Sequence, residues 1–321
     1  MHIICSTDDN FVQHCSVLLT SILINNKGVT IWVLTEGLTE LNQEILKKEV
    51  ESKGGVFNYL VVDSNIISKL PMPEDQLLSH ISKATYYRLL MSEILPETVE
   101  KAIYLDCDII VRESLLELWN TEIDNYAVGA VHQMWNEIED AQRLNYPVKY
   151  GYFNAGVLLI NLKYWRNNSI SSKLVNYLTN NYSTILMHDQ DALNAILYNK
   201  SFTLPCKWNM LHFFFYPDSK SVQGFYQDKL LNDYSEYKKQ LIYDRKNPAV
   251  IHYVSKPKPW QKGCVHPFTK EYFKYARKTI TFSNLTEPKW QITNLKIMLN
   301  KQKLYFNWVL RSIYYKLIKQ R

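Results

Sequence analysis

Apolar and polar residues follow each other along the first part of the chain in a way that predicts strands and helices in turn. Short β-prone apolar runs predict buried strands at residues 2–7, 29–35 and 56–62. Apolar residues at helical spacing predict helices at residues 11–27 and 39–53. This alternation predicts a doubly wound, mostly parallel sheet, in which ligands bind at the carboxyl ends of the strands.

The same pattern continues less regularly further along. It predicts helices at residues 76–94, 168–182 and 190–199, and strands at residues 126–131 and 156–162. Residues 205–248 are rich in aromatic residues and lysine and show weak periodicity, so no structure is assigned to them. Pro288 marks a break before the last segment. We therefore expect one α/β domain at residues 1–280 and a separate segment at residues 281–321.

Two acids, Asp106 and Asp108, stand within "KAIYLDCDIIVRES", whose apolar run at residues 102–111 predicts one buried strand. Residues two apart in a strand point to the same side, so the carboxylates would converge. A turn is the alternative, but the apolar run continues through Val111. Two buried carboxylates are costly without a partner, and a divalent cation is the simplest partner. The stretch predicts a metal site.

Composition excludes several classes of protein. Only 9 Gly are present, and neither GxGxxG nor GxxxxGK[ST] occurs, so a dinucleotide or P-loop phosphate site is not expected. The five Cys form no CxxC pair, which argues against a disulfide framework and suits a reducing cytoplasm. The amino-terminal residues show no signal-peptide pattern, and no apolar run approaches the ~20 residues of a membrane span.

The positive charge of the chain belongs to its last segment. The net charge is +6, but residues 289–321 carry eight basic residues and no acid, which leaves the rest at −2. Apolar residues there approximate one helix face among aromatic and basic side chains. Such a basic amphipathic helix suits an anionic membrane surface. A helix docked on the domain and a nucleic-acid patch are the alternatives. We expect the membrane surface and no nucleic-acid partner.

Four polar motifs have both an ordinary and a functional interpretation. They are "STDDN" at residues 6–10, "YFNAGVLLINL" at 152–162, "HDQDALNAIL" at 188–197 and "VIHYVSKPKPWQ" at 250–261. Helix caps, a turn and a structural histidine are the ordinary ones. Together with Arg88 and Lys258, the motifs supply what a nucleotide-sugar enzyme requires, since cations must neutralise a diphosphate leaving group. Carboxylates favour Mg²⁺ or Mn²⁺, and an added imidazole favours Mn²⁺.

Several ordered motifs resemble those of glycosyltransferase family 8, and within it the bacterial lipopolysaccharide α-galactosyltransferases. The resemblance covers roughly residues 1–265 and rests on "STDDN", "HISKATYYRLL", "YLDCDIIV", "YFNAGVLLINLKYW", "HDQDALN" and "IHYVSKPKPW". It implies a GT-A fold, that is, a single Rossmann-like α/β domain with a mostly parallel mixed sheet. It also implies a nucleotide-diphosphate sugar donor, Mn²⁺ and retention of the anomeric configuration.

The resemblance also implies roles for individual residues. The metal ligands would be Asp106, Asp108 and His252. The nucleotide contacts would be Ser6, Asp8, Asn10, Ile81, Arg88, Cys107 and Lys258. The donor-sugar contacts would be Asn154, Ala155 and Ser255, beside the catalytic residues Gln190 and Asp189. The sugar and acceptor contacts would include His80, Thr85 and Gln133.

Gln190 corresponds to the residue whose role in the family is most debated. Because an amide is a poor nucleophile, we favour front-face attack, in which the leaving phosphate takes the proton of the acceptor and Gln190 stabilises the oxocarbenium-like centre. Asp189 is the alternative nucleophile.

Three departures from the family leave the sugar and the acceptor open. Gln133 stands where an acid is expected, Ser255 stands where a glycine is expected, and residues 209–217 differ from the acceptor loop. We expect transfer from UDP-galactose, or next UDP-glucose, to a lipid-linked or other cell-surface glycan at the inner face of the membrane. The alternatives are extension of protein-linked glycans, a non-catalytic nucleotide-sugar-binding protein and a metal-dependent nucleotide hydrolase.

Overall fold

A seven-stranded sheet forms the centre of the computed structural model, which describes residues 1–63, 70, 83–133, 137–215, 240–254 and 256–288. The strand order is β3-β2-β1-β4-β7-β6-β8. The strands are β1 (His2–Ser6), β2 (Thr30–Thr35), β3 (Val56–Val61), β4 (Lys101–Leu105), β6 (Val128–His132), β7 (Phe153–Asn161) and β8 (Ser201–Thr203). Strand β1 runs parallel to β2 and β4, whereas β7 runs antiparallel to β4 and β6. The sheet is therefore mixed and mostly parallel, as predicted.

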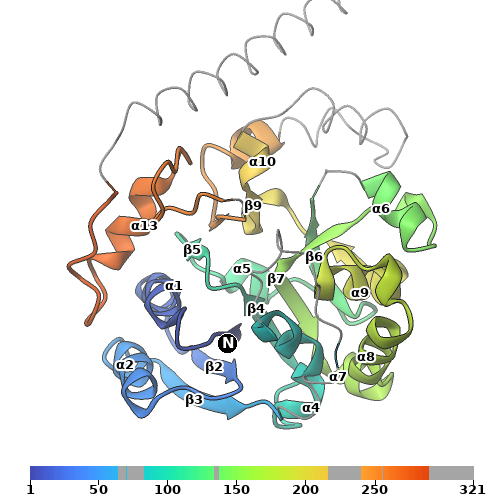
Figure 1. Cartoon of the computed structure of the whole chain (residues 1–321), viewed down its shortest axis with the longest axis horizontal. Coiled ribbons are helices and arrows are strands. Elements are labelled where there is room, and N and C mark those ends of the chain that lie inside the picture. The colour runs from blue at the N-terminus through green and yellow to red at the C-terminus, as the bar shows by residue number, and fades with distance from the viewer. Residues whose placement is uncertain (64–69, 71–82, 134–136, 216–239, 255, 289–321) are drawn as a thin grey trace, which may run out of the picture.

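Helices cover both faces of this sheet. The α-helices are α1 (Val12–Asn25), α2 (Glu40–Glu51), α4 (Met91–Ile94), α5 (Leu116–Trp119), α6 (Glu137–Arg143), α7 (Leu162–Asn167), α8 (Ile170–Asn180), α9 (His188–Leu197), α10 (His212–Phe215) and α13 (Thr269–Ala276). Short 3₁₀ helices are η2 (Lys83–Leu90), η3 (Val148–Tyr150), η4 (Tyr182–Thr184), η5 (Tyr198–Lys200) and η6 (Cys206–Trp208). In Figure 1, α1 and α2 lie on one side of the sheet, and α4, α7, α8 and α9 lie on the other.

The strands are apolar on both faces because two separate cores enclose them. Ile3 and Cys5 of β1 join the core under α1 and α2, whereas Ile4 between them joins the core under α4, α7, α8 and α9. Strands buried on both faces have continuous apolar runs, and the sequence shows such runs. The helices cover the two faces of the sheet and leave the carboxyl ends of the central strands β1 and β4 open.

A second, three-stranded sheet corrects the prediction of one strand at residues 102–111. Strand β4 ends at Leu105, the chain turns at Asp106–Asp108, and β5 (Ile109–Val111) belongs to the other sheet. There β5 pairs antiparallel with β10 (Val250–His252), which runs parallel to β9 (Met210–Leu211). The two halves of the apolar run are buried in different sheets, so hydrophobicity alone did not reveal the turn between them. Helix α13 packs on this small sheet and on α1.

Other predicted elements also differ in type or extent. Of the helix predicted at residues 76–94, the described part is a 3₁₀ helix, η2, followed by the single turn α4. The strand predicted at residues 156–162 begins at Phe153, so Asn154, Ala155 and Gly156 lie within β7 rather than before it. The helix predicted at residues 168–182 is α8, which ends at Asn180.

The expected second segment at residues 281–321 is described only as far as residue 288. The backbone N–H of Ile280 donates to Oε2 of buried Glu49, which ties the end of the domain to α2. The basic residues at 289–321 lie outside the described residues, so the domain boundary remains a prediction. Within the part of the chain that the structure describes, no helix has the length and apolar character needed to cross a membrane.

Candidate active site

A cavity of about 300 Å³ opens at the carboxyl ends of β1 and β4. Strands β1, β4, β7 and β10 and helix α9 all contribute to its walls, together with η2. Most of the residues expected from the sequence line it. They are Ser6, Asp8, Thr85, Arg88, Asp106, Cys107, Asp108, Asn154, Ala155, Asp189, Gln190, His252 and Lys258.

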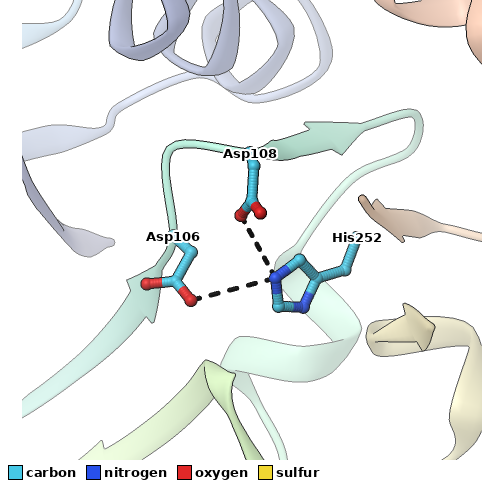
Figure 2. Close-up of side chains that lie close together, drawn as sticks. All are labelled: Asp106, Asp108 and His252. Atoms are coloured by element: carbon cyan, nitrogen blue, oxygen red, sulfur yellow. Dashed lines mark ion pairs between the residues drawn. The ribbon is translucent and has the colours of Figure 1, made fainter. Parts of the chain in front are cut away.

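Asp106, Asp108 and His252 converge at one point of this cavity (Figure 2). One ligand atom from each lies within 4.8 Å of the other two. The Nε2 atom of His252 lies 3.1 Å from Oδ1 of Asp108 and 3.8 Å from Oδ2 of Asp106. The turn between β4 and β5 presents both carboxylates, and the end of β10 presents the imidazole. The carboxylates therefore converge as predicted, although they lie on a turn and not on one strand.

This group of side chains fits a hard divalent cation. Two carboxylates and one imidazole form a donor set suited to Mn²⁺ or Mg²⁺. The backbone of β7 at Gly156 packs closely against the ligands. A Cβ on Gly156 would lie 2.1 Å from Cε1 of His252 and 2.8 Å from Oδ2 of Asp106. A glycine at this position allows β7 to pass close to His252 and Asp106.

Lys258 places a positive charge beside the carboxylates. Its Nζ atom lies 2.6 Å from Oδ2 of Asp108 and donates to the carbonyl oxygen of Tyr253. Burial alone would raise the pKa of Asp108, but the Lys258 ammonium and the neighbouring His252 imidazole hold this pKa well below its usual range. The carboxylate of Asp108 is therefore ionised and available to a cation at neutral pH.

The buried guanidinium of Arg88 connects the metal-binding side of the cavity to the opposite wall. Its Nη2 atom lies 2.7 Å from Oδ1 of Asp106, its Nε atom lies 3.0 Å from Oδ2 of Asp189, and its Nη1 donates to the carbonyl oxygen of Ala155 at 2.6 Å. Tyr104 lies under the guanidinium, 4.4 Å from ring centre to Cζ, and donates to Asp106. Burial would lower the pKa of Arg88, but the two carboxylates raise it above its usual value. Arg88 thus stays charged.

Asp189 is the carboxylate on the opposite wall, in the first turn of α9. Thr85 Oγ1 donates to its Oδ1 at 2.6 Å. Burial raises the pKa of Asp189 to about 6, helped by the charge of Asp106 and opposed by Arg88 and Thr85. Near neutral pH this group is ionised and paired with Arg88.

Gln190 is held by groups on two sides. Its Oε1 accepts from Nδ2 of Asn154 and from the backbone N–H of Ala155, both at 3.0 Å. Its Nε2 donates to Oε1 of Gln133 at 3.2 Å. Gln133 therefore lies behind Gln190, and it is not among the described residues that line the cavity. A carboxamide oriented in this way cannot swing freely, so its position relative to the cavity is fixed.

The remaining expected residues fall elsewhere. Asn10 is exposed, donates its backbone N–H to Oδ1 of Asp8, and is likewise not among the described lining residues. His80, Ile81 and Ser255 lie outside the described residues.

The last acid of the "HDQD" motif, Asp191, does not face the cavity as a sugar clamp would. It is buried, pairs with Arg143 at 2.7 Å and accepts from the Tyr152 hydroxyl. It also accepts the backbone N–H groups of Leu186 and Met187, which directly precede α9, so its role is structural, in line with the ordinary interpretation of this motif.

Sequence reasoning did not single out several residues at this site, and four of them matter to its geometry. Phe11 is one of the apolar residues that predict the helix at residues 11–27, but it is 38% exposed and lines the cavity. Tyr104 stands two residues before Asp106, a spacing that could have placed it on the same side. Gly156 stands in the motif at residues 152–162, but the sequence does not show that His252 and Asp106 lie against it. Asn209, which bonds to both His252 and Asn154, lies in a region without periodicity and gave no signal.

Comparisons with known proteins agree with this fold and site. The family model "Glycosyl transferase family 8" matches residues 2–264. General stress protein A of Bacillus subtilis is 31% identical over 286 residues, which span 87% of this chain and 94% of that protein. Lipopolysaccharide 1,2-glucosyltransferase of Escherichia coli K12 is 25% identical over 285 residues, which span 86% and 77% of the two chains.

A solved structure of the galactosyltransferase LgtC in complex with donor and acceptor sugar analogues superimposes with a TM-score of 0.74 at 26% identity. The match covers 88% of this chain and 97% of that one. The expected GT-A type fold is thereby confirmed for the domain. The family match covers most of the chain and includes the cavity just described. The chain therefore belongs to glycosyl transferase family 8 and is a glycosyltransferase.

Proposed function

We propose that this protein is a retaining, Mn²⁺-dependent hexosyltransferase that moves a sugar from a UDP-sugar to a cell-surface glycan such as lipopolysaccharide. One observation carries the proposal. A triad of Asp106, Asp108 and His252 faces, across one cavity, a wall formed by Asp189 and Gln190. A metal-binding corner opposite fixed polar groups is the arrangement needed to hold a diphosphate at one end and a sugar at the other.

The residues divide the work according to charge. Asp106, Asp108 and His252 would hold Mn²⁺, with Mg²⁺ as the alternative, and the bound cation would supply charge neutralisation for the leaving diphosphate. Lys258 adds a positive charge on the same side. Ser6 and Asp8 line the cavity at the end of β1 and would contact the nucleoside.

Gln190 and Asp189 act at the sugar. We favour front-face transfer, in which the leaving phosphate accepts the proton of the attacking hydroxyl and the Gln190 carboxamide stabilises the oxocarbenium-like centre. Asn154 and Ala155 hold Gln190 in place, as their hydrogen bonds to its Oε1 indicate. Thr85 donates to Asp189 and lines the cavity, and it would contact the acceptor.

Two observations support the proposed substrates. The similar structure is that of a galactosyltransferase, and a relative of similar length is a lipopolysaccharide glucosyltransferase. UDP-galactose is therefore the first donor to test and UDP-glucose the second. A lipid-linked acceptor would place the enzyme at the inner face of the membrane, where the basic residues at 289–321 would meet anionic lipid.

A thermal-shift panel tests the donor and the metal together. The unfolding midpoints of the wild type and Asp108→Ala are measured with UDP-galactose, UDP-glucose, UDP-N-acetylglucosamine and GDP-mannose, each with and without Mn²⁺. A ligand that binds the folded state raises the midpoint. We expect one UDP-sugar to do so only with Mn²⁺ and only in the wild type. The exposed Asp124→Ala, a matched control, should respond as the wild type does. No shift with any pair would contradict the proposal.

The membrane association has its own test. Deletion of residues 289–321 should abolish cosedimentation with vesicles of anionic phospholipid and leave binding of the UDP-sugar intact. Equal sedimentation of the full-length and shortened proteins would show that this segment is not a membrane anchor.

A further inference from the structure

One buried side chain outside the expected site, Asn209, connects the metal-binding corner to the sugar-binding wall. It lies directly before β9 and is fully buried. Its Oδ1 lies 2.9 Å from Nδ1 of His252, and its Nδ2 lies 2.8 Å from Oδ1 of Asn154. It is not among the described residues that line the cavity, so any effect it has on the reaction passes through these two neighbours.

The direction of each bond in this group is determined by the backbone of β7. The N–H of Gly156 lies 3.0 Å from one side-chain atom of Asn154, and a backbone N–H can only donate. That atom is therefore the amide oxygen. Because Asn209 contacts the same oxygen, Asn209 must offer it an N–H. The amide nitrogen of Asn154 then faces Gln190. The Gln190 atom that it contacts also accepts from the backbone N–H of Ala155, so that atom is the amide oxygen of Gln190.

This orientation determines which nitrogen of His252 carries a proton. Since the amide nitrogen of Asn209 faces Asn154, its oxygen faces Nδ1 of His252. An amide oxygen only accepts, so Nδ1 must carry the hydrogen. The other nitrogen, Nε2, faces the carboxylates of Asp106 and Asp108. It can donate a hydrogen to Asp108 while no metal is bound, and a metal ion at this site would take the place of that hydrogen. Second-shell groups commonly select the ligating nitrogen of a histidine in this manner.

We propose that Asn209 is a positioning residue with two roles. Its Oδ1 accepts from Nδ1 of His252 and so orients this ring for metal binding through Nε2. Its side-chain N–H donates to Asn154, which in turn holds Gln190. This inference rests on the proposed metal-dependent transfer. It predicts that the oxygen of the Asn209 amide serves the metal site and that its N–H serves the sugar-binding wall. Asn209→Leu removes both contacts, whereas Asn209→Asp keeps an acceptor for His252 and removes the donor to Asn154.

The first test reads the His252 ring directly, without metal and without turnover. Ring ¹⁵N NMR at pH 8 should show a protonated Nδ1 in the wild type and in Asn209→Asp. In Asn209→Leu the Nδ1 proton loses its acceptor, and the proton should reside on Nε2, beside Asp108. An unprotonated Nδ1 in the wild type would overturn the inference, whatever reaction the protein catalyses.

The second test measures Mn²⁺ affinity by electron paramagnetic resonance. Asn209→Leu should weaken binding roughly 10-fold to 100-fold, the range seen on loss of second-shell partners, and Asn209→Asp should bind within about 3-fold of the wild type. Both variants should lose transfer activity, because both lack the donor to Asn154. Asn26→Leu removes an equally buried amide, which bonds to Ile22 and Leu115, and serves as the control for destabilisation alone.

The outcomes separate this inference from the proposed function. Wild-type Mn²⁺ affinity in Asn209→Leu would overturn the role of Asn209 while leaving the metal site intact. If Asp108→Ala bound Mn²⁺ as the wild type does, the proposed function would fail, and the NMR result would still decide whether Asn209 orients His252.

Discussion

His252 lies beside Asp108 because the two residues end paired strands of the small sheet. Asp108 directly precedes β5, His252 is the last residue of β10, and His252 pairs with Ile109 in antiparallel register. The backbone N–H of Tyr253 also donates to the carbonyl oxygen of Asp108 at 3.0 Å. The spacing of these two side chains is therefore determined by a backbone ladder, and the site is formed before any ligand arrives.

Replacement of His252 by Ala should weaken Mn²⁺ binding by about 10-fold or more, because one of three protein donors is lost and the ladder remains. Titration of free Mn²⁺ by electron paramagnetic resonance measures this change. His2→Ala alters a histidine at the opposite end of β1 and should leave the affinity unchanged. Equal affinities of the wild type and His252→Ala would show that the imidazole is not a ligand.

Gly156→Ala should disrupt the metal-binding site through a steric clash with two of its ligands. The added Cβ would overlap the His252 ring and a carboxylate oxygen of Asp106, so we expect Mn²⁺ binding to fall at least 10-fold. Gly129→Ala on β6 is the matched control, since its Cβ would meet the nearest atoms, of Leu204, at an ordinary 3.4 Å. Isothermal titration of Mn²⁺ into both variants compares them. Unchanged binding in Gly156→Ala would mean that β7 can move away from the ligands.

Gln190→Ala should lower kcat about 100-fold or more with little change in KM, since a dipole fixed toward the developing charge acts mainly in the transition state. Steady-state transfer from UDP-galactose to an oligosaccharide acceptor measures both constants. Gln142→Ala changes an exposed glutamine on α6 and should transfer at the wild-type rate. Near-full activity of Gln190→Ala would contradict a catalytic role for this residue.

The free energy of unfolding should depend on pH through Asp189. Burial raises the pKa of this carboxyl from 3.8 to about 6, so the folded state binds its proton more tightly than the unfolded state does. The stabilisation of the folded state by protonated Asp189 is complete below about pH 4 and is lost as the pH rises through about 6. The full effect is on the order of 3 kcal/mol.

Urea unfolding in EDTA between about pH 5 and pH 7 measures this dependence. Wild-type stability should fall relative to that of Asp189→Asn by roughly half of the full effect over this range. Parallel curves for the two proteins would show that Asp189 has an ordinary pKa in the folded state.

The sequence predicted the alternating layers and the strand ends well, because continuous apolar runs and helical spacing report burial directly. It placed Asp8 just after a strand and predicted that Asp106 and Asp108 converge, and all three residues line the cavity. That His252 joins the two acids was predicted from the family resemblance, which rests on motifs in a fixed order. No periodic pattern in the sequence relates positions so far apart.

What the sequence did not reveal depends on contacts between distant segments. The turn at Asp106–Asp108 is hidden because β4 and β5 are equally apolar, although they belong to different sheets. The role of Asn209 depends on β7 and β10 lying beside β9, and that arrangement exists only in the folded chain.

Arg88 couples the binding of the metal ion to the binding of the donor sugar. One guanidinium pairs with Asp106 on the metal-binding side and with Asp189 on the sugar-binding side. A cation that draws Asp106 away from Arg88 strengthens the hold of Arg88 on Asp189, and a sugar that engages Asp189 does the reverse. Linkage requires that the factor by which the metal changes donor affinity equal the factor by which the donor changes metal affinity. The two ligands are therefore expected to sense each other through a single side chain.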